Sequence, residues 1–139
     1  MEFAGQAQTT RAGADGTWTA TLDPLAASAK PLEMKIALND RHEIFLADVL
    51  VGNVWLCSGQ SNMEWPLANV KFKKYLTDAD FPDTMRWLDI PNQALKAPGL
   101  LYGGKGWMAV ADKKHTQSAV GYYFARKIHK EAGVPIGML

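Results

Sequence analysis

The hydrophobic pattern of the chain changes near residue 48, and this change limits what the chain can fold into. Before it, apolar residues alternate with other residues, as at Leu32, Met34, Ile36 and Leu38. Such alternation is typical of a strand with one buried face. After it, Val54-Trp55-Leu56-Cys57 is apolar at successive positions, which favours a central parallel strand covered on both faces by helices. The sequence therefore predicts a β part followed by an α/β part.

The β part is expected to consist of short antiparallel strands. Residues 17–22 alternate strictly, and residues 6–10 are the expected partner strand in a hairpin. Two further strands are expected around residues 32–38 and 44–46. Because so few strands cannot bury both faces of a sheet, we predict that residues 1–48 are the C-terminal part of a β-rich, sandwich-like domain.

The second part shows the order strand, turn, strand, helix, strand. A short strand is expected at residues 85–90, a loop at 91–106, and a last strand at 134–139. Between them an apolar stripe at helical spacing predicts a helix with Thr116 as a possible N-cap and Gly133 just past its end. Its charged residues can face water: Arg126, Lys127, Lys130 and Glu131. This order is typical of the opening of an α/β domain, here over residues 49–139.

Composition excludes several classes of protein. With 15 Lys+Arg against 14 Asp+Glu, the chain has no concentrated basic face for nucleic acid. The Lys71, Lys73 and Lys74 cluster is most simply a solvated face. One cysteine, Cys57, excludes an intrachain disulfide framework, and we expect it to be a buried apolar side chain. No apolar run approaches the roughly 18–20 residues that cross a bilayer.

The first residues have neither the basic nor the apolar region of a signal peptide. The compartment therefore stays open, with a secreted or periplasmic parent protein among the alternatives. No metal constellation or phosphate loop is present in the sequence, so we expect no cofactor. The oligomeric state is not determined by the sequence.

The segment Ser58-Gly59-Gln60-Ser61-Asn62 ends the apolar strand and must turn sharply. Chemistry in parallel sheets occurs beyond the carboxyl ends of the strands, where a serine is well placed as a nucleophile. A turn or N-capping serine is the alternative explanation, and it stays open at this point. The pattern is not the Gly-x-Ser-x-Gly elbow of α/β-hydrolases, because Met63 occupies its last position.

Residues 49–67, VLVGNVWLCSGQSNMEWPL, resemble the first catalytic block of the sialate O-acetylesterase family. That family is a branch of the SGNH hydrolases that is active on acetylated carbohydrates. Residues 118–130 and 133–137 are similar to the helix and following strand of the same family. The resemblance implies that residues 49–139 begin an SGNH-type, flavodoxin-like three-layer hydrolase domain with a parallel sheet. It also implies that residues 1–48 end a preceding β-sandwich domain.

The resemblance implies roles for individual residues. Ser61 matches the nucleophile, which attacks the acetyl carbonyl to form an acyl-enzyme, and its backbone N–H would be one oxyanion donor. Gly59, Gln60 and Asn62 match the rest of the motif, and the neighbouring Trp65 is a candidate for lining the substrate cleft. Trp87, in contrast, is expected in the core.

The family's other oxyanion donors and its Asp-x-x-His pair have no match in residues 68–139. The three histidines do not replace that pair: His42 is expected in a surface turn, His115 at a solvated helix start, and His129 as a cation near the helix end. We therefore expect a fragment of a metal-independent serine esterase acting on acetyl esters of sialic acid or related sugars. The alternative is a non-catalytic carbohydrate-binding or interaction protein that retains the block.

Overall fold

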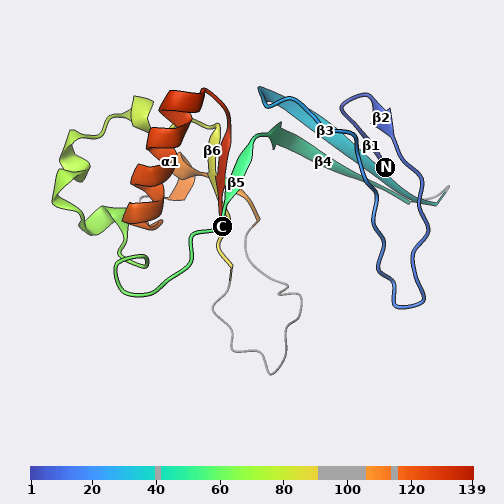
Figure 1. Cartoon of the computed structure of the whole chain (residues 1–139), viewed down its shortest axis with the longest axis horizontal. Helices are drawn as coiled ribbons and strands as arrows, with labels where there is room; N and C mark the ends of the chain where they lie inside the picture. Colours follow the sequence, from blue (N-terminus) through green and yellow to red (C-terminus); the bar gives the residue numbers. More distant parts are fainter. Residues whose placement is uncertain (40–41, 91–105, 114–115) are drawn as a thin grey trace. The chain divides into compact units, whose positions relative to one another are not determined.

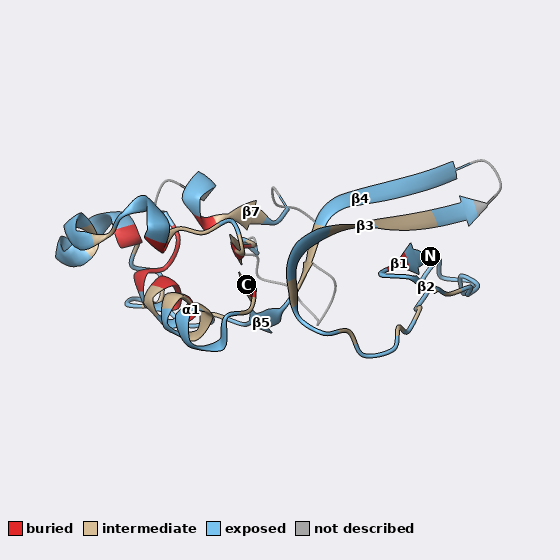
Figure 2. Cartoon of the chain, turned by 90° about the horizontal axis from the view of Figure 1, so that it is seen from above, coloured by how far each residue is buried: buried red, intermediate tan, exposed pale blue. Residues whose placement is uncertain are grey.

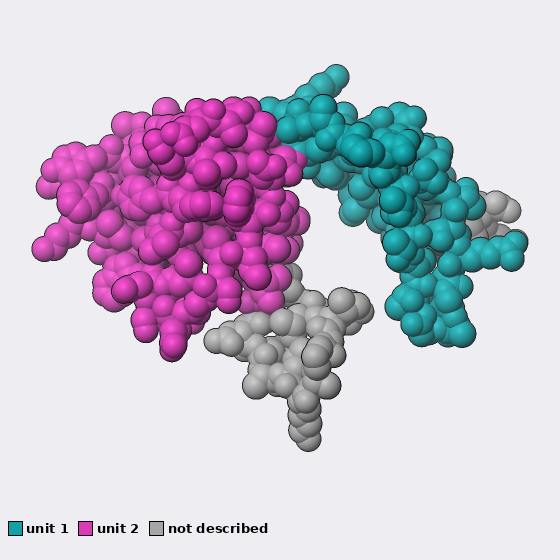
Figure 3. Space-filling model, in the orientation of Figure 1, with its two compact units in different colours: residues 1–51 teal, residues 52–139 magenta. Residues whose placement is uncertain are grey.

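A computed structural model describes residues 1–39, 42–90, 106–113 and 116–139 of the chain (Figure 1). They divide into two compact units, Met1–Val51 and Gly52–Leu139, coloured separately in Figure 3. The division falls just beyond the change of pattern near residue 48. The domain assignments of residues 1–48 and 49–139 stay predictions. Within the described residues no helix is both long and apolar enough to cross a membrane.

The first unit contains one antiparallel sheet within its described residues. Its strands are β1 (Glu2–Phe3), β2 (Gln6–Ala7), β3 (Ser28–Asn39) and β4 (His42–Val51), in the spatial order β2-β1-β3-β4. β3 and β4 form a long pair in which Ile36 lies opposite Ile44. These are the strands expected around residues 32–38 and 44–46, both longer than predicted. The sandwich itself stays a prediction.

The strand predicted at residues 17–22 was wrong, because this segment lies outside any strand. β2 pairs instead with β1. Side-chain hydrogen bonds hold the segment in a loop. The Asp23 backbone N–H donates to Gln6 Oε1 over 2.8 Å, and the Thr17 hydroxyl donates to Asp15 Oδ1 over 2.8 Å. Alternation of apolar and polar residues shows that one face of a segment is apolar. A strand also needs a neighbouring strand whose backbone N–H and C=O groups are free to pair.

The second unit is a mixed α/β structure with the sheet order β5-β8-β6-β7. β5 (Asn53–Trp55), β8 (Ile136–Met138) and β6 (Met85–Trp87) run parallel, and β7 (Met108–Ala109) is antiparallel to β6. Helix α1 (Ala119–Ala132) packs on this sheet (Figure 1). The described part of this unit also contains four short 3-10 helices: η1 (Leu67–Asn69), η2 (Lys71–Tyr75), η3 (Asp78–Asp80) and η4 (Val110–Lys113).

The core lies between α1 and the sheet, in the red segments of Figure 2. Trp87 is buried there, as predicted, and Cys57 packs against it. Burial raises the pKa of the Cys57 thiol. Gly121 allows the close approach of α1, because a Cβ there would lie 3.1 Å from the Trp87 ring and 3.2 Å from Cys57 Sγ. The core residues are Leu67, Met85, Trp87, Val110, Ala119, Tyr122, Ala125, Ile136 and Met138.

The N-cap of helix α1 lies two residues later in the chain than predicted. The N-cap is Ser118 and not Thr116, and Ser118 Oγ accepts a hydrogen bond of 3.2 Å from the Gly121 N–H. The predicted end is confirmed: Gly133 has a φ of +66° and its N–H donates to the His129 carbonyl.

The expectation that the 54–57 strand is central and covered on both faces was wrong. Among the strands that the structure describes, β5 is the outermost of its sheet, and Val54 and Leu56 are 58% and 75% exposed. The Trp55 ring packs edge to face against the Phe124 ring of α1, with 5.0 Å between the ring centroids. Within the described residues no strand pairs with the outer edge of β5. Continuous apolar sequence does not reveal whether both faces are covered.

An exposed apolar edge strand is a template for pairing with another chain. We expect this chain to self-associate in a concentration-dependent manner, and Val54→Lys to shift it toward monomer in analytical ultracentrifugation. The control is Val120→Lys, which adds the same charge on α1, where Val120 is 49% exposed and outside any strand edge. A wild-type chain that stays monomeric at all concentrations contradicts this expectation.

Candidate functional site

The turn that carries Ser61 begins where β5 leaves the sheet. Backbone pairing with β8 continues past β5: the Leu139 N–H donates to the Trp55 carbonyl over 2.9 Å, and the Cys57 N–H donates to the Leu139 carbonyl over 2.7 Å. Ser58 is therefore the first residue beyond the paired segment. This places the following turn at the carboxyl edge of the parallel strands, the edge where such sheets bind ligands.

Ser61 has a left-handed backbone with a φ of +53°, an uncommon conformation for a residue with a side chain. Two hydrogen bonds of 3.1 Å close the turn around it, from the Met63 N–H to the Gln60 carbonyl and from the Glu64 N–H to the Ser61 carbonyl. The side chain is exposed to solvent. The Ser61 N–H donates no hydrogen bond to any residue that the structure describes, so this donor is available to a ligand.

Gly59 is required by the tightness of the turn. Its φ is +152°, and a Cβ at this position would lie 3.0 Å from the Cβ of Met63. A side chain there would therefore push Met63 away and open the turn around Ser61. Gln60 and Asn62, the other two motif residues, lie on the turn and are exposed.

The start of α1 holds the far end of the turn. The Ala119 N–H donates to the Trp65 carbonyl over 2.8 Å, and the Leu67 N–H donates to the Gln117 carbonyl over 2.9 Å. The Ser118 hydroxyl also donates to Met63 Sδ over 3.4 Å. Sequence reasoning missed this clamp, because backbone pairing between distant segments leaves no periodic signal.

Trp65 lies immediately beyond the turn, with 53% of its surface exposed. Its backbone carbonyl accepts the Ala119 N–H, and its exposed surface lies four residues after Ser61 in the chain. Its assignment to a substrate cleft stays a prediction.

The histidines do not supply a partner for Ser61 within the described part of the second unit. His129 Nε2 lies 2.8 Å from the hydroxyl of Thr84, the residue before β6, which places it toward the amino edge of the sheet. Burial, and secondarily Lys130, lowers the pKa of His129, which disfavours the cation expected near the helix end. His42 is exposed at the start of β4 in the first unit, and His115 lies outside the described residues.

Asp89 follows β6 and so lies toward the same edge of the sheet as the Ser61 turn, a placement that sequence reasoning missed. Its Oδ1 accepts a hydrogen bond of 2.6 Å from the Trp87 indole N–H, which fixes the carboxylate against the core. Among the described residues no three His, Cys, Asp or Glu side chains are grouped so as to hold a metal ion.

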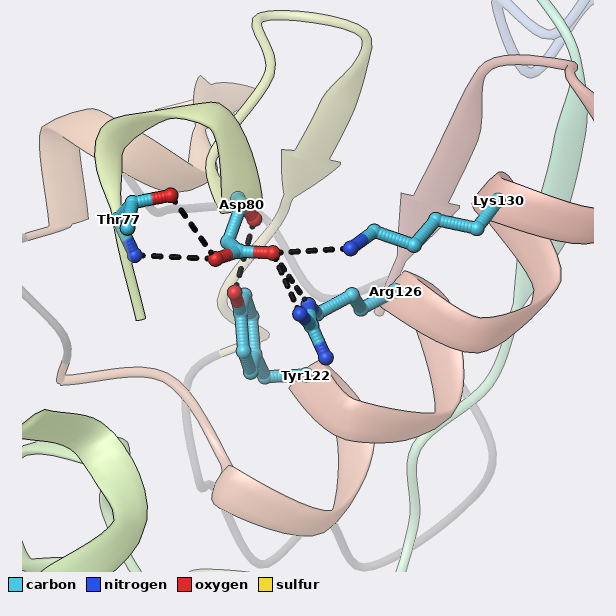
Figure 4. A network of polar contacts seen from close by, with 5 residues as sticks. All are labelled: Thr77, Asp80, Tyr122, Arg126 and Lys130. Atoms are coloured by element: carbon cyan, nitrogen blue, oxygen red, sulfur yellow. Dashed lines mark hydrogen bonds and ion pairs between the residues drawn. The ribbon is translucent and has the colours of Figure 1, made fainter. Parts of the chain in front are cut away.

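A polar cluster around Asp80, separate from the Ser61 turn, joins η3 to α1 (Figure 4). Asp80 Oδ2 accepts from the Thr77 N–H over 3.0 Å, while Oδ1 accepts from Arg126 Nε over 2.8 Å and from Lys130 Nζ over 3.0 Å. The Tyr122 hydroxyl donates to the Asp80 backbone carbonyl over 2.8 Å.

These bonds, foremost that from the Thr77 backbone and then those from Lys130 and Arg126, hold the pKa of Asp80 well below its usual range. Arg126 and Lys130 were predicted to be able to face water, and the Lys130 side chain is 53% exposed, but both also pair with Asp80. Their charged ends reach back to an acid 46 and 50 residues earlier in the chain. The spacing of charged residues along α1 does not show that they pair with a residue from a distant segment.

No protein-family model matches the chain. No curated protein matches it. A solved structure of a carbohydrate acetylesterase from Xanthomonas citri is similar, with 35% sequence identity and a TM-score of 0.88. The similarity covers 99% of this chain and 32% of that one. The chain thus spans about a third of the length of this relative.

Proposed function

We propose that this chain carries the nucleophile segment of a serine carbohydrate O-acetylesterase, with Ser61 as the nucleophile. The observation that carries the proposal is the left-handed, exposed Ser61 beyond the carboxyl end of a parallel strand. In α/β-hydrolases, a strained turn that follows a strand exposes the catalytic serine. The 35% identity to a carbohydrate acetylesterase supports the substrate class.

In the proposed reaction, Ser61 Oγ attacks the acetyl carbonyl and loses its proton to a general base. The bond between the carbonyl carbon and the sugar oxygen then breaks, the sugar oxygen takes up a proton, and the sugar leaves. Water hydrolyses the acetyl-serine to acetate and free serine. The available Ser61 N–H is the proposed donor to the oxyanion that forms in both steps.

The neighbouring residues are proposed to shape the site. Gly59 keeps the turn tight, Gln60 and Asn62 flank the nucleophile, and Trp65 forms one wall of the sugar site. The general base and the remaining oxyanion donors are proposed to lie outside the described residues. We further propose that the segment works within a longer protein, because the relative is roughly three times as long.

The finer family assignment belongs to the same proposal. We infer that the second unit begins an SGNH-type, flavodoxin-like hydrolase domain and that the first unit ends a β-sandwich domain. The resemblance of residues 49–67 to sialate O-acetylesterases supports these assignments and a substrate that is an acetylated sialic acid or a related sugar.

A fluorophosphonate probe tests the nucleophile directly. We expect the probe to label the chain at Ser61, as detected by intact mass and peptide mapping. The extent of labelling should fall at least tenfold in Ser61→Ala. Ser58→Ala is the matched control, since Ser58 is an exposed serine three positions earlier in the same segment, and it should keep the label. Equal labelling of wild type and Ser61→Ala would refute the role of Ser61.

The same chain should hydrolyse p-nitrophenyl acetate only slowly, because a serine without its base loses most of its rate advantage. Fast hydrolysis that disappears in Ser61→Ala would keep the nucleophile but overturn the placement of the base outside the described residues.

A non-catalytic carbohydrate-binding protein is the second candidate function. It is favoured by one observation: no histidine lies with Ser61 at the carboxyl edge in the described part of the second unit. A chain that binds acetylated sugars but takes no label at Ser61 would support this candidate over the esterase.

A further inference from the structure

The short helix η2 carries two aromatic rings and three lysines, here called the η2 surface: Lys71, Phe72, Lys73, Lys74 and Tyr75, all exposed except the half-buried Lys73. The side chains of Phe72 and Tyr75 are each 68% exposed, and their ring centroids lie 6.4 Å apart at an interplanar angle of 31°. Within the described residues neither ring belongs to the hydrophobic core of the second unit, so both are available to a ligand.

The lysines give this surface a positive charge. Lys74 Nζ lies 5.0 Å from the centroid of the Tyr75 ring, in a cation–π arrangement that leaves most of the ring accessible. Within the part of the chain that the structure describes, none of the three lysines forms an ion pair. Their charges therefore remain available to an anion.

A cavity of about 300 Å³ adjoins the η2 surface. Lys73 belongs to both, and Leu76, Phe81 and Ala111 also line the cavity. Thr77 and Asp78 also line the cavity, but the Thr77 hydroxyl already donates to Asp80 Oδ2 over 3.2 Å, and the Asp78 carboxylate makes the lysine side of the site the place for an anionic group. This volume is at the lower end of that of small-ligand sites and is comparable to one or two sugar rings.

We propose that the η2 surface and its cavity bind an oligosaccharide that carries carboxylate groups, such as a chain of uronic acids. The apolar faces of pyranose rings pack on aromatic rings, and lysine ammonium groups pair with the sugar carboxylates. The choice of carbohydrate as the ligand rests on the proposed function. The aromatic pair and the cavity indicate where the ligand binds. The unpaired lysines indicate that the ligand is negatively charged.

Other anionic partners fit the η2 surface less well. Nucleic-acid sites typically neutralise roughly 6–10 phosphates, and lipid-binding clusters have about four to eight basic residues. The η2 surface has three lysines in a chain of net charge +1.

Binding to a short polygalacturonate oligomer tests the proposal, with a neutral maltooligosaccharide of the same length as the comparison ligand. We expect the uronate oligomer to bind the whole chain more tightly than the neutral one, with an affinity that falls as salt is added. The double variant Phe72→Ala with Tyr75→Ala should lose about tenfold in affinity. The triple variant that changes Lys71, Lys73 and Lys74 to glutamine should lose a similar factor and its salt dependence.

Phe45→Ala is the matched control. Phe45 is an exposed aromatic residue under a lysine, but that lysine, Lys35, is paired with Glu43 at 2.6 Å. This variant should bind the uronate oligomer as the wild type does. Circular dichroism melts check that the variants of exposed η2 residues remain folded.

All binding experiments are repeated in a Ser61→Ala background, where affinity should be unchanged. Loss of esterase function therefore leaves this proposal intact, and absence of uronate binding leaves the role of Ser61 intact. The proposal is overturned if the uronate oligomer does not bind or binds equally to both η2 variants. Tighter binding to single-stranded DNA or to phosphatidylserine vesicles also overturns it.

Discussion

Asp80→Asn is expected to lower the free energy of unfolding by about 2–3 kcal/mol. The substitution keeps the size of the side chain but removes the charge that Arg126 and Lys130 share. Removing one partner of a fully buried ion pair costs about 3–5 kcal/mol. We expect a smaller loss because the Lys130 side chain is 53% exposed and regains water.

Urea unfolding followed by circular dichroism measures this change. Asp78→Asn is the control, because Asp78 lies in the same 3-10 helix but is exposed, and its effect should stay within about 0.5 kcal/mol. Equal stability of Asp80→Asn and wild type would show that the cluster in Figure 4 does not hold η3 to α1.

The sign of the pH dependence follows from the lowered pKa of Asp80. The folded state favours the carboxylate, so this stabilisation is complete above the ordinary carboxyl pKa of about 3.9. It is lost as the pH falls from there toward the lower pKa of the folded state. The stability difference between wild type and Asp80→Asn should therefore shrink as acid is added below about pH 4.

Gly52→Ala is expected to cost about 3 kcal/mol, because there is no space for a methyl group at this position. A Cβ on Gly52 would lie 2.1 Å from the Pro135 carbonyl oxygen. That oxygen accepts the Asn53 N–H over 3.0 Å, the first bond that pairs β5 with β8. Backbone cannot yield as a flexible side chain can, so β5 must move away from β8.

The melting temperature and fluorophosphonate labelling should both fall in Gly52→Ala, since β5 positions the Ser61 turn. Gly133→Ala is the comparison: Gly133 has a φ of +66° but open space around it, so its cost should be about 1 kcal/mol, with labelling unchanged. A Gly52→Ala variant that melts like wild type would mean that β5 and β8 can separate without loss.

Local features could be predicted from the sequence where the reason for them is local. The helix end at Gly133 and the strands around Ile36 and Ile44 follow from backbone freedom and from alternation. The same reasoning failed at residues 17–22, where hydrogen bonds accepted by the Gln6 and Asp15 side chains hold a loop. It failed again at β5, whose apolar residues are exposed at an edge.

The candidate site divides in the same way. Its residues, Gly59 to Asn62, were recognisable from a chemically unusual run of sequence, but the strained conformation of Ser61 and the clamp from Ser118 were not. The η2 surface was visible only as a short basic cluster. Its exposed rings and adjoining cavity depend on how η2 packs against the rest of the unit.

By itself the sequence determined the order of β5, β6, α1 and β8, the end of α1 and the position of the serine after a strand. The tertiary structure decided that β5 is an edge strand, that Asp80 pairs with Arg126 and Lys130, and that α1 holds the Ser61 turn. Periodicity reports which side of an element is apolar, whereas the group that meets that side depends on contacts between residues far apart in the chain.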